Sequence, residues 1–420
     1  MKSILMSLFL SLSILLTAQE PEKTVDALVT PKIAEQVITV GGQTAQIAGF
    51  NNQSIQFAID AVAKTGGIVK LNKGVYDIKA PVRMKSNVKL IGAGEETILK
   101  RAAGVQTKYV VDADFGEIKL TVENADGFEI GMKIQVTDEE NSGCWNVSTA
   151  YVTDISDNNI YIDKGLIRDY RADKNGLISN ASSVIEVLDV ENALIYNLVA
   201  DGNRAENFFA DGCNSAGILI LRSKKVTVDN VKVKDFNGEG ISWQITENVT
   251  IKNSEISGSG NTGLHPGTGS PFSTIENNKI HHNDRDGLFI CWRVFQSQVS
   301  NNKIYENGRF GICTGHKDTD VIFRYNHIYN NKNDGVNLRG EREPNAPHRN
   351  TFISNTIENN VGYGFSVNSA AKDLVLKDNI FKNSAKSQKA AIYIYKDGST
   401  PKLENNKFDK HELGEMVFEK

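Results

Sequence analysis

Cysteine is scarce in this sequence, with only four among 420 residues: Cys144, Cys213, Cys291 and Cys313. Four scattered cysteines are few for a chain of this size, so disulfides are not expected to be the basis of its fold. Cys291 and Cys313 fall on adjacent units of the repeat described below, which leaves a bridge between them open. They lie two strand positions apart, however, and free thiols are the preferred interpretation.

A large excess of one charge is also missing. The net charge is −4, so no basic field points to nucleic acid as a partner. The sequence has no zinc-ligand spacing, no phosphate-binding loop and no nucleophile elbow. After the first residues it has no apolar run long enough to span a membrane. We therefore predict no metal ligand from motifs, no required cofactor and no membrane span.

The beginning of the chain has the pattern of a targeting segment. Lys2 precedes an apolar run from Ile4 to Leu16, which is followed by Thr17-Ala18-Gln19. This order is typical of a secretory signal peptide, and we predict residues 1–18 as that peptide. A secreted or periplasmic location is expected after cleavage. Residues 19–45 are interpreted as a lead-in segment to a single domain over residues 46–420.

The second half of the chain does contain a regular repeat of glycine followed by a short apolar strand. An Asn-x-Ile element precedes several of these glycines by nine residues, at Asn278, Asn302, Asn326 and Asn355. A period of this length is typical of repeat architectures. The repeat positions, mostly 23 or 24 residues apart and with alanine last, are Gly217, Gly240, Gly263, Gly287, Gly311, Gly335, Gly364 and Ala391.

Each repeat unit carries strands too short to bury an apolar face alone, so units must stack with each strand parallel to its copy in the next unit. We predict an all-β fold, a right-handed parallel β-helix, with the asparagines stacked at one corner in an architectural role. Asn52 to Lys64 has the period of an amphipathic helix that caps the open end. The period breaks at about 103–183, where alternating runs predict an inserted β subdomain.

A family resemblance supports this fold. The stretch from Gln56 through Gly66-Gly67-Ile68-Val69 to Gly74-Val75-Tyr76 resembles the N-terminal segment of the pectate-lyase superfamily. With the coils, the resemblance covers most of the mature chain. It implies a secreted protein of polysaccharide metabolism, since members are mainly lyases, hydrolases and epimerases, with some adhesins and phage tail proteins. Fold alone does not choose among these activities.

Alternation along the repeated strand predicts which side chains leave the core. The first and third residues after each glycine are expected to point inward, and the second and fourth outward onto one solvent-facing wall. Gly267 and Gly315 are expected to leave room there for a sugar ring. The outward positions and their turns supply the predicted substrate contacts Gln244, Trp292, Arg293, Asn337, Glu341 and Arg342.

The same wall carries the predicted catalytic residues His265, His316, Lys317 and Arg339. We expect β-elimination on a uronic acid, which needs a base, an acid and a cation on the carboxylate. His265 and His316 are the base and acid candidates, with Lys317 or Tyr170 as substitutes. Arg339, aided by Arg342 or Arg293, is the candidate for neutralising the carboxylate. Each has a structural alternative: a surface histidine, a solvated turn, or an ion pair between Arg339 and Glu341.

Other functions stay open. Glu239, Asp284, Asp286 and Asp334 offer acidic pairs for an inverting glycoside hydrolase, and Asp284 with Asp286 is also a candidate Ca²⁺ site. A carbohydrate-binding β-helix without chemistry is the third alternative. Residues 265–270, 286–292 and 315–320 are similar to β-helix proteins associated with polysaccharide breakdown, among them dehydratases of ulvan oligosaccharides. The expected partner is an acidic polysaccharide or oligosaccharide; no oligomeric state is predicted.

Overall fold

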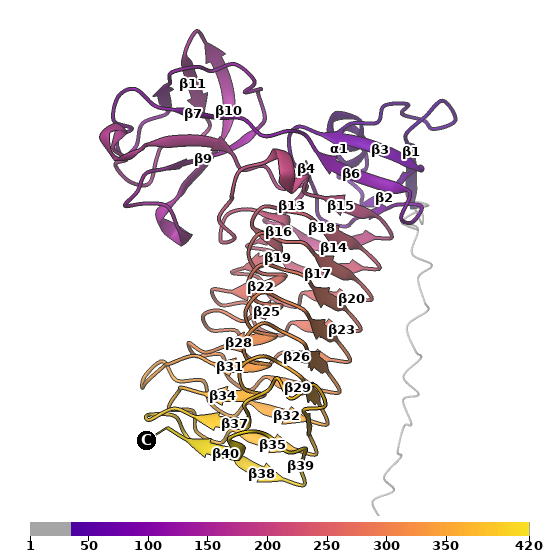
Figure 1. Cartoon of the computed structure of the whole chain (residues 1–420). Coiled ribbons are helices and arrows are strands. Elements are labelled where there is room, and N and C mark those ends of the chain that lie inside the picture. Colours follow the sequence, from indigo (N-terminus) through magenta and orange to yellow (C-terminus); the bar gives the residue numbers. More distant parts are fainter. Residues whose placement is uncertain (1–34, 420) are drawn as a thin grey trace, which may run out of the picture. The chain divides into compact units, whose positions relative to one another are not determined.

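The computed structural model describes residues 35–419, and its parallel strands stack in successive coils. Each coil gives one strand to each of three sheets, called sheets C, A and B in the order in which the chain visits them. Figure 1 shows the strands of successive coils lying one above another. The predicted all-β parallel β-helix is confirmed. The predicted signal peptide, residues 1–18, lies outside the described residues.

The three sheets are parallel throughout. Sheet A contains β1 (Gln36–Val40), β2 (Gly67–Leu71), β5 (Val88–Ile91), β14 (Glu191–Tyr196), β17 (Lys224–Asp229), β20 (Thr250–Lys252), β23 (Thr274–Glu276), β26 (Gln298–Ser300), β29 (Ile322–Arg324), β32 (Thr351–Ile353), β35 (Val375–Lys377) and β38 (Lys402–Glu404). Sheet B contains β3 (Gly74–Ile78), β6 (Thr97–Arg101), β15 (Val199–Asp201), β18 (Lys232–Lys234), β21 (Glu255–Ser257), β24 (Lys279–His281), β27 (Lys303–Tyr305), β30 (His327–Tyr329), β33 (Thr356–Glu358), β36 (Ile380–Lys382) and β39 (Lys407–Phe408).

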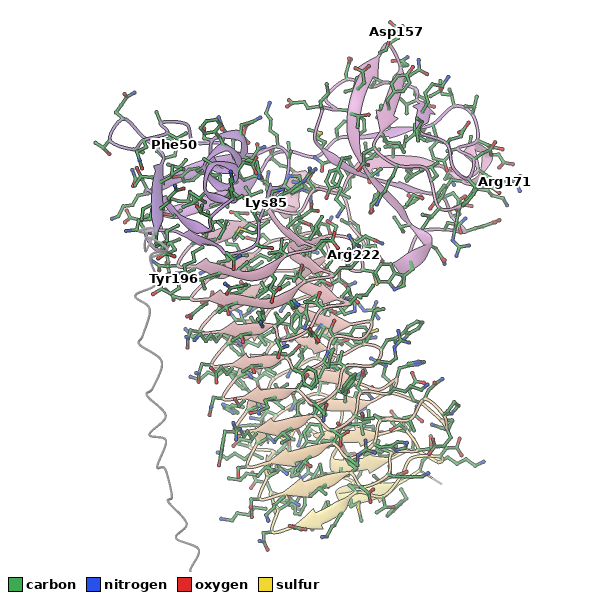
Figure 2. All side chains as sticks on the ribbon, turned by 180° about the vertical axis from the view of Figure 1, so that it is seen from behind. Phe50, Lys85, Asp157, Arg171, Tyr196 and Arg222 are labelled. Atoms are coloured by element: carbon green, nitrogen blue, oxygen red, sulfur yellow. The ribbon has the colours of Figure 1, made fainter. Side chains whose placement is uncertain are left out.

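Sheet C is built from the repeated strand after each glycine. It contains β4 (Val82–Arg83), β13 (Ile185–Leu188), β16 (Ala216–Leu221), β19 (Glu239–Gln244), β22 (Leu264–Gly267), β25 (Leu288–Phe289), β28 (Ile312–Thr314), β31 (Val336–Leu338), β34 (Phe365–Val367), β37 (Ala390–Ile394) and β40 (Gly414–Phe418). Its inward residues, such as Ile241, Leu264 and Ile312, belong to one continuous apolar core. Side chains fill the space enclosed by the coils (Figure 2).

The repeated glycines pack against residues of the next coil, which explains why they recur with the period of the coils. A Cβ atom on Gly287 would lie 2.4 Å from Ile304 Cγ2 and 2.7 Å from Asn307 Nδ2, both on the next coil. Only glycine fits against that corner. The buried Asn302 side chain donates 2.9 Å hydrogen bonds to the Ile275 carbonyl and to Asn326 Oδ1. The asparagine corner thus joins successive coils.

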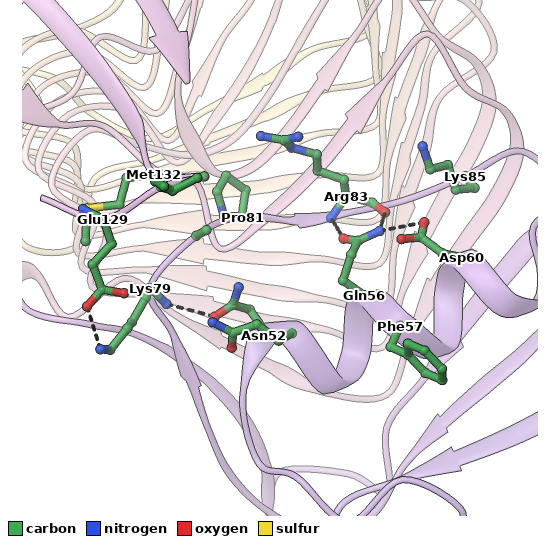
Figure 3. Close-up of a pocket in the computed structure, with 14 residues that line it drawn as sticks. Asn52, Gln56, Phe57, Asp60, Lys79, Pro81, Arg83, Lys85, Glu129 and Met132 are labelled. Carbon is green, nitrogen blue, oxygen red and sulfur yellow. Dashed lines mark hydrogen bonds and ion pairs between the residues drawn. The ribbon is translucent and has the colours of Figure 1, made fainter. Parts of the chain in front are cut away.

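The helix α1 (Asn52–Val62) is capped at its N-terminus by Asn51, whose side chain accepts a hydrogen bond from the Ser54 amide. Its apolar side is buried and, as Figure 3 shows, its Gln56 side chain reaches β4. Gln56 accepts from the Arg83 amide at 2.8 Å and donates to the Arg83 carbonyl at 3.1 Å. The amide therefore occupies the place of a neighbouring strand at the open edge of sheet C. No helix among residues 35–419 is long and apolar enough to cross a membrane.

A separate six-stranded sheet interrupts the coils. It consists of β7 (Gln106–Lys108), β8 (Lys119–Thr121), β9 (Lys133–Thr137), β10 (Ser148–Ser156), β11 (Asn159–Ile162) and β12 (Leu177–Asn180) and has its own apolar core. Its fully buried Tyr170, the candidate substitute for the base or acid, donates a 2.8 Å hydrogen bond to the Asn146 carbonyl within the inserted sheet. Lys133 anchors this sheet through a buried 2.8 Å ion pair with Glu186 of β13.

Candidate active site on sheet C

The predicted outward residues of sheet C alternate along the strands with core residues. His265 follows Leu264, and Asn337 and Arg339 flank Leu338; both leucines belong to the apolar core. The Phe289 ring links these residues along the sheet. Its centroid lies 5.2 Å from that of His265 and 4.7 Å from the Arg339 guanidinium carbon. The contacts of Phe289 therefore bring His265 and Arg339 to the same side of sheet C.

Much of this wall is not open to solvent, contrary to expectation. His265 is 5% exposed and Gln244 is fully buried. The loop that precedes β16 covers this part, because a Cβ atom on its Gly212 would lie 1.9 Å from the Glu239 carboxyl carbon. Neither residue can serve as an open sugar contact in this arrangement. The strand alternation could not predict this burial, because it results from a loop between two coils that folds back over the face of sheet C.

His265 is held in a buried polar group. Its Nδ1 lies 3.5 Å from Glu239 Oε1, which also accepts a 3.0 Å hydrogen bond from Asn261. Burial lowers the pKa of His265, but interactions with Cys291 and with Glu239 outweigh burial and raise this pKa to about 10. Burial raises the pKa of Glu239, against the lowering effect of His265. The raised pKa means that the buried His265 ring carries its second proton at neutral pH, beside Glu239.

Arg339 is half-buried rather than free to bind a substrate carboxylate. Its Nη1 donates a 2.8 Å hydrogen bond to the Ile290 carbonyl, and its Nη2 lies 3.6 Å from Asp318 Oδ2. A Cβ atom on Gly315 would lie 2.7 Å from Arg339 Nε. The space expected for a sugar ring at Gly315 is thus filled by Arg339, and that at Gly267 by Gln244, whose Oε1 would lie 2.6 Å from a Cβ atom there.

The exposed part of the predicted site gathers in the turns that leave β25, β28 and β31. We call Trp292, Arg293, His316, Lys317 and Glu341 the tryptophan–histidine cluster. The rings of Trp292 and His316 stack at 4.9 Å with an interplanar angle of 23°. His316 Nδ1 lies 3.5 Å from Glu341 Oε1, and the Arg293 amide donates a 2.9 Å bond to the His316 carbonyl.

The backbone fixes this cluster. Trp292, Arg293 and Lys317 have φ values of 65°, 62° and 58°, the left-handed region that non-glycine residues seldom adopt. The Lys317 amide donates a 2.8 Å hydrogen bond to the Asn345 carbonyl. Trp292 is 44% exposed, whereas the His316 side chain is 19% exposed. The cluster is accessible, aromatic and cationic.

The two remaining predicted contacts are paired within the protein. Asn337 donates a 2.8 Å hydrogen bond to Ser366 Oγ, and this hydroxyl donates to Asp334 Oδ2 at 2.6 Å. Arg342 is exposed, and its Nη2 donates a 3.1 Å hydrogen bond to Asp397. Arg342 is therefore exposed but paired with Asp397, and Asn337 belongs to a hydrogen-bond network with Ser366 and Asp334.

The carboxylates of the rival interpretation have other partners. Asp286 is buried and accepts a 2.7 Å hydrogen bond from Arg309, and Asp284 accepts a 3.0 Å bond from Arg204. Each of the two proposed Ca²⁺ ligands is thus paired with a different arginine. Among residues 35–419, no group of three or more His, Cys, Asp or Glu side chains is arranged to hold a metal ion.

Sequence reasoning missed two partners on this wall. Asp318, fully buried, accepts hydrogen bonds from the Gly315 amide at 2.9 Å and from the Val294 amide at 3.0 Å. Phe289 joins His265 to Arg339. Both were visible as outward or turn positions of the repeat, but their pairing depends on side-chain reach between coils.

A separate cavity of about 480 Å³ lies away from this wall, and Figure 3 shows it beside α1. Its polar groups have structural partners: Lys79 pairs with Glu129 at 2.7 Å, and Gln56 bonds to Arg83. None of the predicted site residues lines it. The wall of sheet C remains the candidate site.

The stacked parallel coils define a parallel β-helix, and a comparison with protein-family models identifies the family to which this β-helix belongs. The model described as "Right handed beta helix region" matches residues 134–352 and 273–408. These matches span more than half of the sequence, so the chain belongs to this family. No curated protein sequence matches the chain.

Several solved structures share the fold. The A-module of the Azotobacter vinelandii mannuronan C-5 epimerase AlgE4 is 18% identical, with a TM-score of 0.52 over 88% of this chain and 93% of that one. The polygalacturonase of Erwinia carotovora is 12% identical, with a TM-score of 0.54 over 92% and 97%. The exopolygalacturonase of Thermotoga maritima is 14% identical, with a TM-score of 0.52 over 87% and 84%. Such low identities show the fold alone.

Proposed function

We propose that the chain is a carbohydrate-active enzyme that performs β-elimination on saccharides containing uronic acid. The observation that carries this proposal is the tryptophan–histidine cluster, where an exposed indole ring stacks on an imidazole that lies beside a carboxylate. The cations Arg293 and Lys317 directly follow these two rings in the chain. The structures that share the fold include a mannuronan epimerase and polygalacturonases, and mannuronan and polygalacturonan are acidic polysaccharides. This context favours an acidic saccharide over a neutral one.

In the proposed reaction, His316 removes the C5 proton of a uronic acid. Glu341 beside Nδ1 orients the ring, so that Nε2 faces the substrate. The C5–H electron pair forms the C4–C5 double bond as the C4–O bond breaks, and the departing oxygen takes a proton from Lys317. Arg293 and Arg342 neutralise the substrate carboxylate, which acidifies C5.

Arg339 and His265 take supporting roles in this proposal, because both are turned toward internal partners. Arg339 holds the turn of β28 through Asp318, and His265 supports Phe289 from the covered side. The leaving group decides the product: a departing sugar makes the enzyme a polysaccharide lyase, and a departing hydroxyl makes it an oligosaccharide dehydratase, as the ulvan resemblance implies.

Pectic, alginate and ulvan-type chains and oligomers test the proposal, with ultraviolet absorbance reporting an unsaturated uronate. His316→Ala is expected to lower kcat by roughly 10²–10⁴-fold. The matched control is His282→Ala, an exposed histidine that directly follows β24 and pairs with Glu306 at 3.0 Å. New reducing ends without unsaturation would replace elimination by hydrolysis, and no turnover on any of these saccharides would leave a binding role.

A further inference from the structure

Two cysteines from distant parts of the chain meet where the inserted sheet contacts the coils. Cys144 lies in the short helix η1 (Cys144–Asn146) between β9 and β10 and is exposed. Cys213 is buried in the loop before β16. Each thiol has the largest single effect on the pKa of the other, and the amides of both residues bind the same side chain, that of Asp211. This pair is not the bridge between Cys291 and Cys313 that the repeat left open.

One carboxylate fixes the backbones of both cysteines. Asp211 Oδ2 accepts a 2.7 Å hydrogen bond from the Cys144 amide, and its Oδ1 accepts a 3.0 Å bond from the Cys213 amide. The Asn214 side chain donates a 3.0 Å bond to the Cys144 carbonyl. Cys144 has a φ of 53°, a strained value for a residue with a side chain. Fixed contacts on both sides therefore hold the two thiols together.

The two thiols differ in acidity, which gives each a separate chemical role. The Cys213 thiol lowers the pKa of Cys144 to about 7, although burial and Asp211 oppose this. The Cys144 thiol raises the pKa of Cys213, and burial adds to the effect. Thiolate is the attacking form in thiol–disulfide exchange. Cys144 is thus the exposed nucleophile, and Cys213 is the resolving thiol behind it.

We propose that Cys144 and Cys213 are a redox-active pair that closes to a disulfide and clamps the inserted sheet onto the loop that covers Glu239. The loop already lies there, because Gly212 packs against the Glu239 carboxyl group. The ligand class is a small-molecule disulfide. The Cys144 thiolate attacks one of its sulfurs, forms a mixed disulfide and releases a thiol.

Cys213 then attacks the Cys144 sulfur and expels the second thiol. Once Cys144 is in the mixed disulfide it carries no negative charge, which removes the largest cause of the raised pKa of Cys213 and favours its deprotonation. Over both steps the protein loses two electrons and two protons, and the oxidant disulfide is reduced to two thiols. This chemistry is independent of any turnover on saccharides.

The test uses the reduced full chain treated with oxidised glutathione. Thiol titration after denaturation should fall by half, from four thiols to two. Peptide mapping without reductant should find one linkage, between Cys144 and Cys213. Four remaining thiols, or a linkage that involves Cys291 or Cys313, would overturn the proposal. These wild-type measurements stand even where a variant fails to fold.

Variants separate the two roles. In Cys213→Ser, the mixed disulfide with glutathione should accumulate at Cys144, because nothing resolves it. In Cys144→Ser, the buried thiol of Cys213 should react with oxidised glutathione at least tenfold more slowly than Cys144 does in the wild type. Cys291→Ser is the matched control and should close the disulfide at the wild-type rate. Equal reactivity of Cys144→Ser and the wild type would contradict the assignment of Cys144 as nucleophile.

Discussion

Arg339 Nη2 lies 3.6 Å from Asp318 Oδ2, and the aspartate is fully buried. Burial raises the pKa of Asp318 to about 7, although Arg339 and the Gly315 amide act against it. The carboxyl group therefore titrates near neutrality in the folded protein and near 4 when unfolded. The strength of this pair depends on pH, which has a measurable consequence.

We expect Arg339→Ala to destabilise the fold more at pH 8 than at pH 5.5. At pH 8 the variant leaves an ionised Asp318 buried without its cation, which costs about 3–5 kcal/mol. At pH 5.5 the carboxyl group is protonated in both proteins, so the difference shrinks. Urea unfolding at the two pH values measures it. Arg349→Ala is the control: because its pair with Asp320 is exposed, this variant should change stability far less, and by the same amount at both pH values.

The asparagine corner gives a second prediction. Asn302→Ala removes hydrogen bonds to the Ile275 carbonyl and to Asn326 on the neighbouring coils. Because buried polar groups are left without partners, the free energy of unfolding should fall by about 2–3 kcal/mol. The exposed neighbour Lys303→Ala should change it by less than about 0.5 kcal/mol. Thermal unfolding of both variants checks this, and equal stabilities would show that the corner is not structural.

The sequence predicted the coils well because the fold is quasi-one-dimensional. Gly287, Ile304 and Asn307 contact across one coil step, so a local repeat encodes a local contact. Strand alternation likewise separated Leu264 in the core from His265 outside it. A second buried asparagine ladder, at Asn283 and Asn307, was equally periodic and was overlooked.

The covering of the wall could not be predicted in the same way. His265 is buried because a loop far from it in the repeat pattern, containing Gly212, lies over Glu239. No period links these positions. The pairing of Arg339 with Asp318 also depends on how far a long side chain reaches between turns. The sequence pattern predicts on which face of the coil a side chain lies. It does not predict which loops and side chains from other coils pack against that face.

The His265–Glu239 pair predicts a pH dependence of stability. The pKa of His265 is raised from its ordinary 6.5 to about 10 in the folded protein. A raised pKa on a cationic group adds stability that is fully present below pH 6.5 and is lost as the pH rises toward 10. Relative to His265→Gln, the wild type should lose up to about 1.4 kcal/mol per pH unit in that window.

Urea unfolding of both proteins between pH 6 and pH 10 measures this loss. Glu239→Gln is the matched variant, because it keeps the shape of the side chain but removes the charge that favours the protonated His265. Its stability should depend less on pH than that of the wild type. A wild-type advantage that stays constant across the window would show that His265 is neutral in the folded protein.

Trp292 tests whether the exposed cluster binds saccharide. Its 44% exposed ring, stacked on His316, offers a flat surface to a sugar, and Trp292→Ala removes that surface. We expect a loss of about 1 kcal/mol of ring contact, which corresponds to a rise in KM of roughly fivefold with kcat changed less. Tyr325→Ala is the control, since Tyr325 is 58% exposed and also has a left-handed backbone, but lies between β29 and β30. Equal effects of the two variants would place the saccharide elsewhere on the coils.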